Sequence, residues 1–181
     1  MSATRLLILG ALRFLQPTHG YNVRRELESW HADQWANIAY GSIYHALKTM
    51  ADEGLIRPVE TEQVGGRPAR TSYVVTEQGE EEFQRLLREY WWELKPFNDP
   101  FMVALAFIAD LPKEETIAAL RHRIAMLNGQ IEELEYNVKS PLSDYRPRHV
   151  ADQLRLAIMR LEAELHWAED AIPKVERDEL P

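Results

Sequence analysis

A helical stretch near residue 45 carries the side chains best suited to bind another molecule. Between Tyr40 and Met50, the apolar residues Ile43, Leu47 and Met50 recur at the spacing of one helix face. The opposite side presents small, aromatic, hydrogen-bonding or basic residues: Gly41, Ser42, Tyr44, His45, Lys48 and Thr49. Such groups bond to DNA phosphates and base edges, so we expect this side to enter a major groove. The alternative is a solvated helix face, for which the composition is also adequate.

Each of these side chains has an expected role at the groove. Gly41 would allow close approach of the backbone, and Ser42 and Tyr44 would bond to phosphates. His45, Lys48 and Thr49 would reach base edges or phosphates.

Two arginines form the second candidate group. Segments 55–61 and 71–75 are rich in β-branched residues and predict two strands, and residues 63–70 between them are rich in turn formers. Arg67 and Arg70 therefore lie near the tip of a hairpin, where guanidinium groups can enter a minor groove or clamp phosphates. The alternative is an ordinary turn with solvent-exposed arginines. Arg24 and Arg25 are weaker candidates, since they can pair with Glu28.

The surrounding pattern predicts the elements that position these groups. Residues 4–15 form a helix that is apolar on most of its circumference, and Thr18 is expected to cap a helix over 21–30 with Tyr21 facing inward. Residues 31–37 are expected to be a connector. Gly54 would end the helix at 40–52, and Thr76 would cap a long helix to about residue 94. A recognition helix at 40–52 with a wing at 57–75 predicts a winged helix-turn-helix.

The second half is expected to be entirely helical. Asp99 and Pro100 predict a capped helix start before the apolar segment 101–110. A seam of apolar residues then recurs at alternating spacings of three and four: Ile117, Leu120, Ile124, Leu127, Ile131, Leu134 and Val138. Residues 139–148 form a loop before a second long helix, so the two helices should pair antiparallel. We therefore predict a mainly α protein with a small β-hairpin, with a DNA-binding domain at 1–95 and a coiled-coil-like dimerisation domain at 96–181.

The net charge of −8 is unevenly distributed. Residues 1–79 hold 8 basic and 8 acidic residues, whereas residues 80–181 hold 13 basic and 21 acidic ones. A neutral first half can still read DNA, but with few phosphate contacts and weakly as a monomer. Two copies in a homodimer would double those contacts.

Several classes of function are not supported by the sequence. The chain has no cysteine, which excludes disulfides and thiol nucleophiles. Its histidines form no HxxxH or HExxH pair, and it has no phosphate-binding loop or nucleophile elbow, so we expect no catalytic residues, no metal and no cofactor. No stretch approaches the about 20 apolar residues that span a bilayer, and the apolar start lacks a cleavage pattern. We therefore expect a soluble cytoplasmic protein.

One aromatic cluster is a candidate effector site. Tyr90, Trp91, Trp92 and Phe97 would suit a flat, apolar small molecule if they line a dimer cleft. The alternative is that these aromatic residues only pack at an interface.

Several separate patches of the first 95 residues follow one another in a characteristic order: Leu6 to Leu12, His19 to Val23, Gly41 to Tyr44, Leu47, Glu53 to Ile56, Gly65 to Arg70, Tyr73 and Thr76 to Gly79. In these patches the chain closely resembles the PadR family of bacterial transcription regulators. Where the family usually has proline after the tyrosine, this chain has His45. The helical second half resembles the longer-tailed branch related to the virulence activator AphA. The resemblance implies a dimeric winged-helix repressor that binds double-stranded DNA, and many such proteins respond to phenolic or hydrophobic small molecules.

The main competing hypothesis keeps the winged helix but gives it a protein partner. In that case the acidic helical hairpin would be the main interaction surface, and specific DNA binding would be absent.

Overall fold

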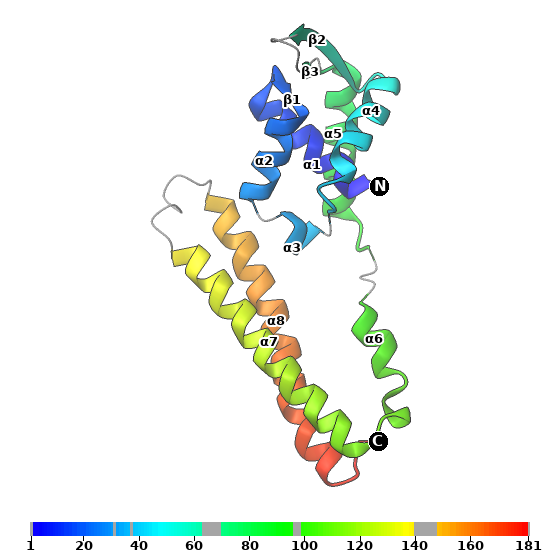
Figure 1. Ribbon diagram of the computed structural model, residues 1–181, viewed down its shortest axis with the longest axis vertical. Helices are drawn as coiled ribbons and strands as arrows, with labels where there is room; N and C mark the ends of the chain where they lie inside the picture. The colour runs from blue at the N-terminus through cyan, green and yellow to red at the C-terminus, as the bar shows by residue number, and fades with distance from the viewer. Residues whose placement is uncertain are drawn as a thin grey trace. The chain divides into compact units, whose positions relative to one another are not determined.

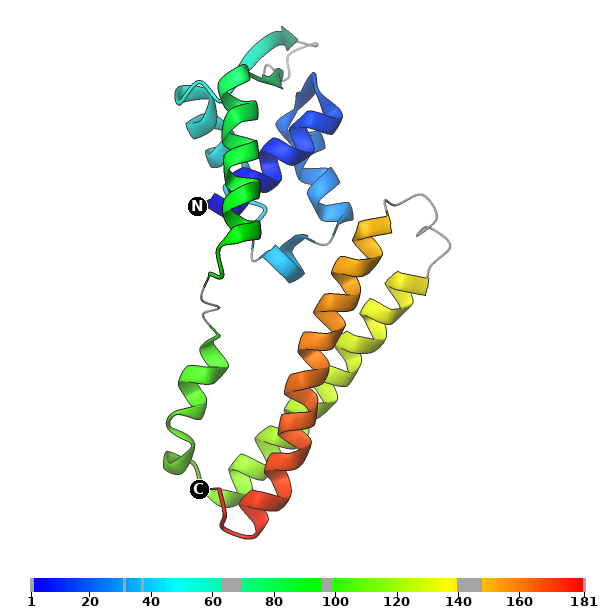
Figure 2. The same cartoon turned by 180° about the vertical axis from the view of Figure 1, so that it is seen from behind.

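Helices account for most of the chain, and two separate units are present. The computed structural model describes residues 2–30, 32–36, 38–62, 70–95, 99–139 and 148–180 (Figures 1 and 2). The units are Met1–Pro96 and Phe97–Pro181. The first contains all the described strands, and the second is helical throughout its described residues. The predicted fold class, mainly α with a small β element, is confirmed.

In the described part of the first unit, five helices pack with a three-stranded antiparallel sheet, whose β2–β3 hairpin lies at one end of the unit (Figures 1 and 2). Its helices are α1 (Ser2–Leu15), α2 (Gly20–Ser29), α3 (Ala32–Ala36), α4 (Ser42–Asp52) and α5 (Glu77–Trp92). Its strands are β1 (Thr18–His19), β2 (Ile56–Glu62) and β3 (Arg70–Val75), in the order β1-β3-β2. The two longer strands form the predicted hairpin, with Ile56 opposite Val75. The register is irregular between Pro58 and Glu60, where proline provides no amide donor to the ladder.

The core of this unit is formed mainly by α1, α2 and α4. Fully buried residues come from each helix: Ile8, Leu9 and Leu12 from α1, Val23 and Leu27 from α2, and Ile43, Leu47 and Met50 from α4. The apolar face predicted for α4 is therefore the face that packs inward. Its opposite face is left available to solvent.

Predicted capping residues are found at the end of α4 and at the start of α5. Gly54 follows α4 with a φ of +76°, a conformation that residues with a Cβ rarely adopt. The Thr76 Oγ1 accepts a hydrogen bond from the Gly79 amide at 3.0 Å and donates one to the Gly54 carbonyl at 2.7 Å. Both predictions are confirmed, and the Thr76 hydroxyl ties the two helix ends together.

Three local predictions about the first unit were wrong. Thr18 does not cap α2, because it lies in β1 opposite Tyr73 and its Oγ1 accepts a hydrogen bond from the Asn22 side chain (Nδ2) at 3.0 Å. Tyr21 does not face inward, since it is 62% exposed. The expected connector at 31–37 contains the short helix α3. Thr18 is placed in a strand by its pairing with the distant β3, and α3 is only five residues long, so local propensity did not indicate either feature.

The second unit is a helical hairpin with a short leading helix. It contains α6 (Pro100–Leu105), a 3₁₀ turn η1 (Ile108–Asp110), α7 (Lys113–Lys139) and α8 (Arg148–Glu176). The Asp99 side chain accepts from the Phe101 amide at 2.8 Å, and Pro100 opens α6, as predicted. The single helix expected over 101–110 is instead split into α6 and η1. The Phe101 ring lies edge-on to Trp167 of α8, with 5.7 Å between the ring centroids.

The two long helices pair antiparallel, as their apolar seams predicted. Lys113 at the start of α7 donates to the Glu176 carbonyl at the end of α8 over 2.8 Å, and Arg123 pairs with Glu164. Leu120 and Leu127 of α7 are buried, as are Ala168, Ala171 and Val175 of α8. Close packing along the seam therefore holds the hairpin together.

Candidate nucleic-acid interface

The outward face of α4 carries the polar residues that the sequence singled out. Gly41, Ser42, Tyr44, His45 and Lys48 are exposed and Thr49 is half-buried. Tyr44 is 48% exposed although it is a large aromatic residue. Because Ile43, Leu47 and Met50 are fixed in the core, the orientation of this face is fixed as well. The six residues therefore form one surface, which we call the α4 face.

Two of these residues have local features that bear on close approach to DNA. The Ser42 hydroxyl donates to the Ala39 carbonyl at 2.7 Å, which leaves its oxygen as an acceptor. A Cβ added at Gly41 would meet nothing within 4 Å. Gly41 has an ordinary helical φ of −63°, so its backbone does not require glycine. Gly41 therefore has open space in front of it and a backbone conformation that any residue could adopt. A position of this kind suits the close approach of another molecule.

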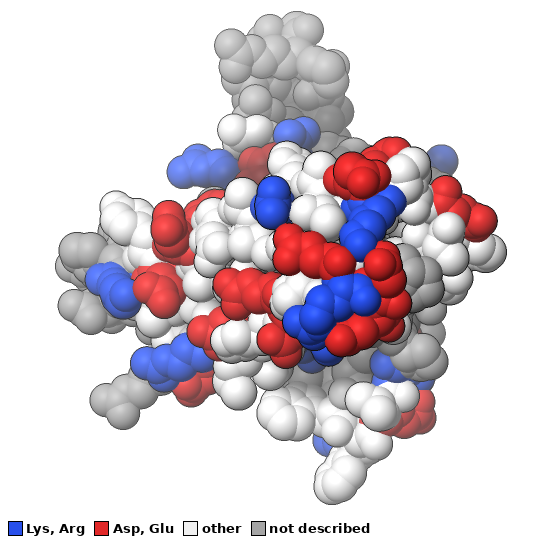
Figure 3. All heavy atoms as spheres, turned by 90° about the horizontal axis from the view of Figure 1, so that it is seen from below, with Lys and Arg blue, Asp and Glu red and all other residues white. Residues whose placement is uncertain are grey.

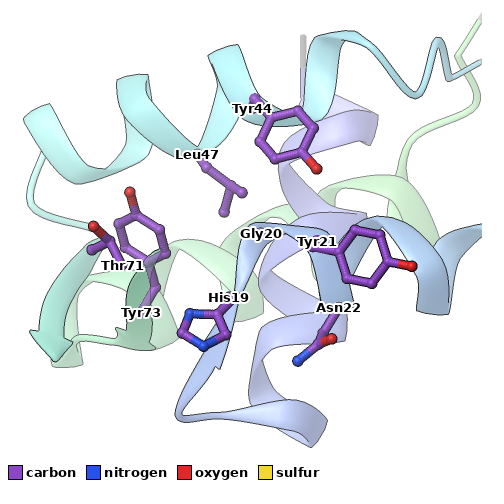
Figure 4. A pocket seen from close by; sticks show the side chains of 8 residues that line it. All are labelled: His19, Gly20, Tyr21, Asn22, Tyr44, Leu47, Thr71 and Tyr73. Atoms are coloured by element: carbon purple, nitrogen blue, oxygen red, sulfur yellow. The ribbon is translucent and has the colours of Figure 1, made fainter. Parts of the chain in front are cut away.

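A hollow of about 570 Å³ lies between α4, the start of α2 and strand β3 (Figure 4). Its lining comes from β1, α2, α4 and β3: His19, Gly20, Tyr21, Asn22, Tyr44, Leu47, Thr71 and Tyr73. Three phenols, a threonine hydroxyl, an imidazole and an amide give it many neutral hydrogen-bonding groups. Groups of this kind suit an acceptor-rich ligand such as a nucleic-acid backbone.

Hydrogen bonds hold the rim of this hollow in place. His19 Nδ1 lies 3.2 Å from the Oγ of Ser72, which is 6% exposed.

On α2, the Arg24 guanidinium lies 2.7 Å from the Glu28 carboxylate, one helical turn away. The pKa of Arg24 is raised by the hydrogen bond to Glu28 and by the negative charge of that residue. Arg24 is therefore already paired with a carboxylate of its own helix.

Other cations of the first unit are not paired in this way. Among the side chains described in residues 2–95, the cations without an ion pair to another described residue are Arg25, Lys48, Arg57 and Arg88. Arg25, Lys48 and Arg57 are exposed and belong to α2, α4 and β2. An unpaired cation can meet a phosphate without first breaking an internal ion pair. Arg25 is therefore a better candidate than Arg24.

The predicted wing arginines lie at the limit of what the structure describes. Arg67 lies outside the described residues. Arg70 begins strand β3, and its side chain is also outside them. Their assignment to the wing tip stays a prediction.

The end of the α7–α8 hairpin has a different charge character. Acidic and basic side chains are intermingled where α7 begins and α8 ends (Figure 3). Many of them are paired across short distances: Lys113 with Asp178 at 2.7 Å, Arg177 with Glu179 at 2.8 Å, and Arg121 with Glu176 at 3.7 Å. A mixed and internally paired surface offers little attraction to a polyanion.

The described members of the aromatic cluster, Tyr90, Trp91 and Trp92, do not line the hollow. Trp91 and Trp92, at the end of α5, are 81% and 86% exposed, and Tyr90 is half-buried. Phe97 lies outside the described residues. Exposed tryptophans on a helix end need a covering surface before they can enclose a ligand.

Sequence reasoning missed several residues that the fold brings to this region. His19, Tyr21, Asn22, Thr71 and Tyr73 share the hollow with Tyr44. The run His-Gly-Tyr-Asn at 19–22 contained a usable signal, because polar and aromatic residues there surround a glycine at a helix start. Arg57 had no distinguishing pattern within its strand.

Neither a metal site nor a membrane span was found within the described part of the chain. Its residues form no cluster of three His, Asp or Glu side chains that could hold a metal ion. None of its helices combines the length and apolar character needed to cross a membrane.

Two protein-family profiles match the chain in consecutive segments. Residues 8–85 match the transcriptional regulator PadR-like family, and residues 97–176 match the virulence activator alpha C-term family. No curated protein matches the sequence.

Solved structures of similar fold cover nearly the whole chain. Bacillus subtilis PadR in complex with operator DNA is 21% identical with a TM-score of 0.73, covering 97% of this chain and 98% of that one. The same protein in complex with p-coumaric acid is 20% identical with a TM-score of 0.68, covering 96% and 97%. The Vibrio cholerae virulence activator AphA is 16% identical with a TM-score of 0.68, covering 96% and 98%. At these identities the likeness establishes the fold.

Proposed function

We propose that the chain is a transcriptional regulator that binds DNA as a homodimer and acts as a repressor. Residues 8–85 match the PadR-like family of transcriptional regulators and residues 97–176 match the virulence activator alpha C-term family, which supports this proposal. The observation that carries this proposal is the α4 face, whose exposed polar residues stand on a buried apolar face. A repressor needs such a rigid reading surface to hold a site against competing proteins.

Double-stranded DNA is the partner that the surface chemistry favours. The α4 face provides hydroxyl, imidazole and ammonium groups, and the unpaired Arg25 and Arg57 flank it in sequence on α2 and β2. The related PadR of Bacillus subtilis has been solved with operator DNA, which supports the same class of partner for this chain. We propose that α4 reads the major groove and that Arg67 and Arg70 of the wing contact the backbone or minor groove.

A homodimer would supply the phosphate contacts that one copy lacks. One copy offers few free cations, so its affinity for DNA would be low at physiological salt. The second unit exposes apolar side chains on the segment from α6 to η1 and just beyond: Met102 (63%), Val103 (63%), Phe107 (61%) and Leu111 (44%). Apolar residues gathered on one segment suit an interface between copies. Two recognition helices would then address two half-sites.

Release by a small aromatic molecule is the regulatory part of the proposal. The relative from Bacillus subtilis has been solved with p-coumaric acid, a phenolic acid. In this chain we propose Tyr90, Trp91, Trp92 and Phe97 as the effector-binding residues. The two exposed tryptophans would become part of an enclosed site once a second copy covers them.

Direct binding to DNA tests the function. The protein should shift a fragment of the DNA upstream of its own gene at moderate salt, and an unrelated fragment of equal length should not compete. Sedimentation should give twice the monomer mass for the free protein, and that mass plus the mass of the DNA fragment for the complex. Binding of equal strength to every fragment, or to none, would favour the protein-interaction alternative.

Arg67→Ala is expected to weaken operator binding and to flatten its salt dependence. Each lost phosphate contact should reduce the slope of log affinity against log salt by about 0.9, and a dimer loses one contact per copy. Fluorescence anisotropy across a salt series measures this slope. The matched control is Arg160→Ala on α8, which should leave the slope unchanged. An unchanged slope in Arg67→Ala would remove Arg67 from the interface.

Phenolic acids and planar aromatic compounds are expected to quench tryptophan fluorescence and to weaken operator binding. The chain has five tryptophans, so the assignment requires the Trp91→Phe/Trp92→Phe variant, in which the quenching should be largely lost. A Trp167→Phe variant serves as the control, because Trp167 packs inside the second unit against Phe101. If no compound of either class changes the fluorescence, the effector hypothesis is wrong.

A further inference from the structure

The first residue of α2 contacts α4 more closely than a residue with a side chain could. Gly20 is buried, and a Cβ built on it would lie 2.8 Å from Leu47 Cδ1. The same Cβ would lie 3.3 Å and 3.4 Å from two carbons of the Tyr44 ring. These separations are at or below the limit of normal carbon contacts. Figure 4 shows all three residues at the hollow beside the α4 face.

The two neighbours of Gly20 differ in their freedom to move. Leu47 is 2% exposed and surrounded by the core, so its methyl group has little room to retreat. Tyr44 is 48% exposed, and its ring can tilt toward solvent. A methyl group at position 20 would therefore push on Leu47 and displace the Tyr44 ring. The predicted consequence falls on the DNA-binding face as well as on the core.

We propose that Gly20 is a positioning residue for DNA recognition, because its missing side chain lets the Tyr44 ring lie against the start of α2 and so fixes the direction of the Tyr44 hydroxyl. This inference rests on the proposed function, in which that hydroxyl bonds to a DNA phosphate. Gly20 itself needs no contact with DNA. Its φ is not in the left-handed range, so the requirement for glycine comes from the close approach.

The expected effect follows from the geometry of hydrogen bonds. A bond to a charged oxygen weakens steeply when its distance or angle departs from the optimum. A ring displaced by a few tenths of an ångström, with its hydroxyl at the far end, would weaken one such bond in each copy. We expect Gly20→Ala to reduce operator affinity by about tenfold, part of the loss expected when hydrogen bonds to a charged group are broken.

A double-mutant cycle between position 20 and the Tyr44 hydroxyl tests the proposal. Tyr44→Phe keeps the ring, and so keeps its contact with position 20, but removes the hydroxyl. Gly20→Ala should cost about tenfold in affinity in the Tyr44 protein and less than about twofold in the Tyr44→Phe protein. The shift in unfolding midpoint caused by Gly20→Ala should be the same in both backgrounds, because the ring is present in both.

Two further variants keep the test interpretable. If Gly20→Ala does not fold, it is made in a Leu47→Val background, where the methyl at 2.8 Å is absent and the contact with Tyr44 is isolated. Gly129→Ala on α7 is the matched control, since a Cβ there meets nothing within 4 Å. It should leave operator binding unchanged.

The outcomes separate this inference from the function on which it rests. An equal loss of affinity in the Tyr44 and Tyr44→Phe proteins, or no loss in either, would overturn the positioning role while leaving DNA binding intact. Tyr44→Phe binding as tightly as the unaltered protein would overturn it as well, because the hydroxyl would then make no contact. An unaltered protein that fails to bind operator DNA would instead overturn the proposed function.

Discussion

Replacing Tyr44 with alanine should reduce operator binding by at least about 100-fold while leaving the unfolding midpoint nearly unchanged. A hydrogen bond to a charged group contributes about 1.5–3 kcal/mol, and a homodimer would lose one in each copy. The loss of the ring, which lies next to the start of α2, would add to this. Tyr44 is 48% exposed, so its removal takes little apolar surface from the core.

The measurement needs both affinity and stability from the same preparations. Anisotropy with labelled operator DNA gives the affinity, and urea unfolding followed by circular dichroism gives the stability. Tyr136→Ala on α7 is the matched control, because Tyr136 is 73% exposed and belongs to the second unit. It should change neither quantity by much. A joint loss of stability and binding in Tyr44→Ala would show that Tyr44 supports the core.

The elements of the winged helix could be predicted because their signals are local. Ile43, Leu47 and Met50 give α4 an unambiguous period, and burial of all three orients the opposite face. Gly54 and Thr76 mark helix ends through their own backbone and side-chain chemistry. The seams of α7 and α8 repeat over many turns, so a single irregular residue could not hide them. These features needed no knowledge of the tertiary structure.

The features that sequence reasoning missed depend on contacts between distant segments. Strand β1 has only two residues and exists because Thr18 and His19 pair with β3, more than 50 residues away. Because Thr18 belongs to this strand, its hydroxyl does not cap α2. The hydroxyl oxygen instead accepts a hydrogen bond from the Asn22 side chain. The hollow beside α4 likewise forms only when α2, α4 and β3 meet. No local pattern encodes such an arrangement.

The sequence alone also could not show which basic side chains form ion pairs within the chain. Arg24 and Arg25 are adjacent and chemically identical, yet only Arg24 reaches Glu28. An i,i+4 spacing makes that pair plausible, but the sequence does not show which arginines stay free in the folded chain. The structure makes Arg25, Lys48 and Arg57 candidates for phosphate contact. Of these, the sequence had indicated Lys48 as a main candidate and Arg25 as a weaker one, but not Arg57.

The fold itself should be most sensitive at Gly79, in the first turn of α5. A Cβ added there would lie 1.9 Å from the Leu55 carbonyl oxygen and 2.9 Å from Val75 Cγ1. That carbonyl cannot easily move away, because it accepts a hydrogen bond from the Thr76 amide at 3.0 Å. The Thr76 hydroxyl lies 3.1 Å from the same oxygen and shares its one proton between this carbonyl and that of Gly54. Leu55 is also 4% exposed. The methyl group must therefore displace the start of α5 or break the bonds that cap it.

Gly79→Ala is thus expected to lower the free energy of unfolding by about 3 kcal/mol or more, near the upper end of single-substitution effects. Urea unfolding at equal protein concentrations measures the change, because association would otherwise shift the midpoint. Two other glycine-to-alanine variants serve as controls for the effect of Gly79→Ala. Gly10→Ala meets only the Phe83 ring at 3.4 Å and should have little effect, and Gly129→Ala should stabilise α7 by up to about 1 kcal/mol. If Gly79→Ala were as stable as Gly10→Ala, the close packing of α5 on the Leu55 carbonyl would be wrong. The capped junction that joins the end of α4 to the start of α5 would then have to be looser than described.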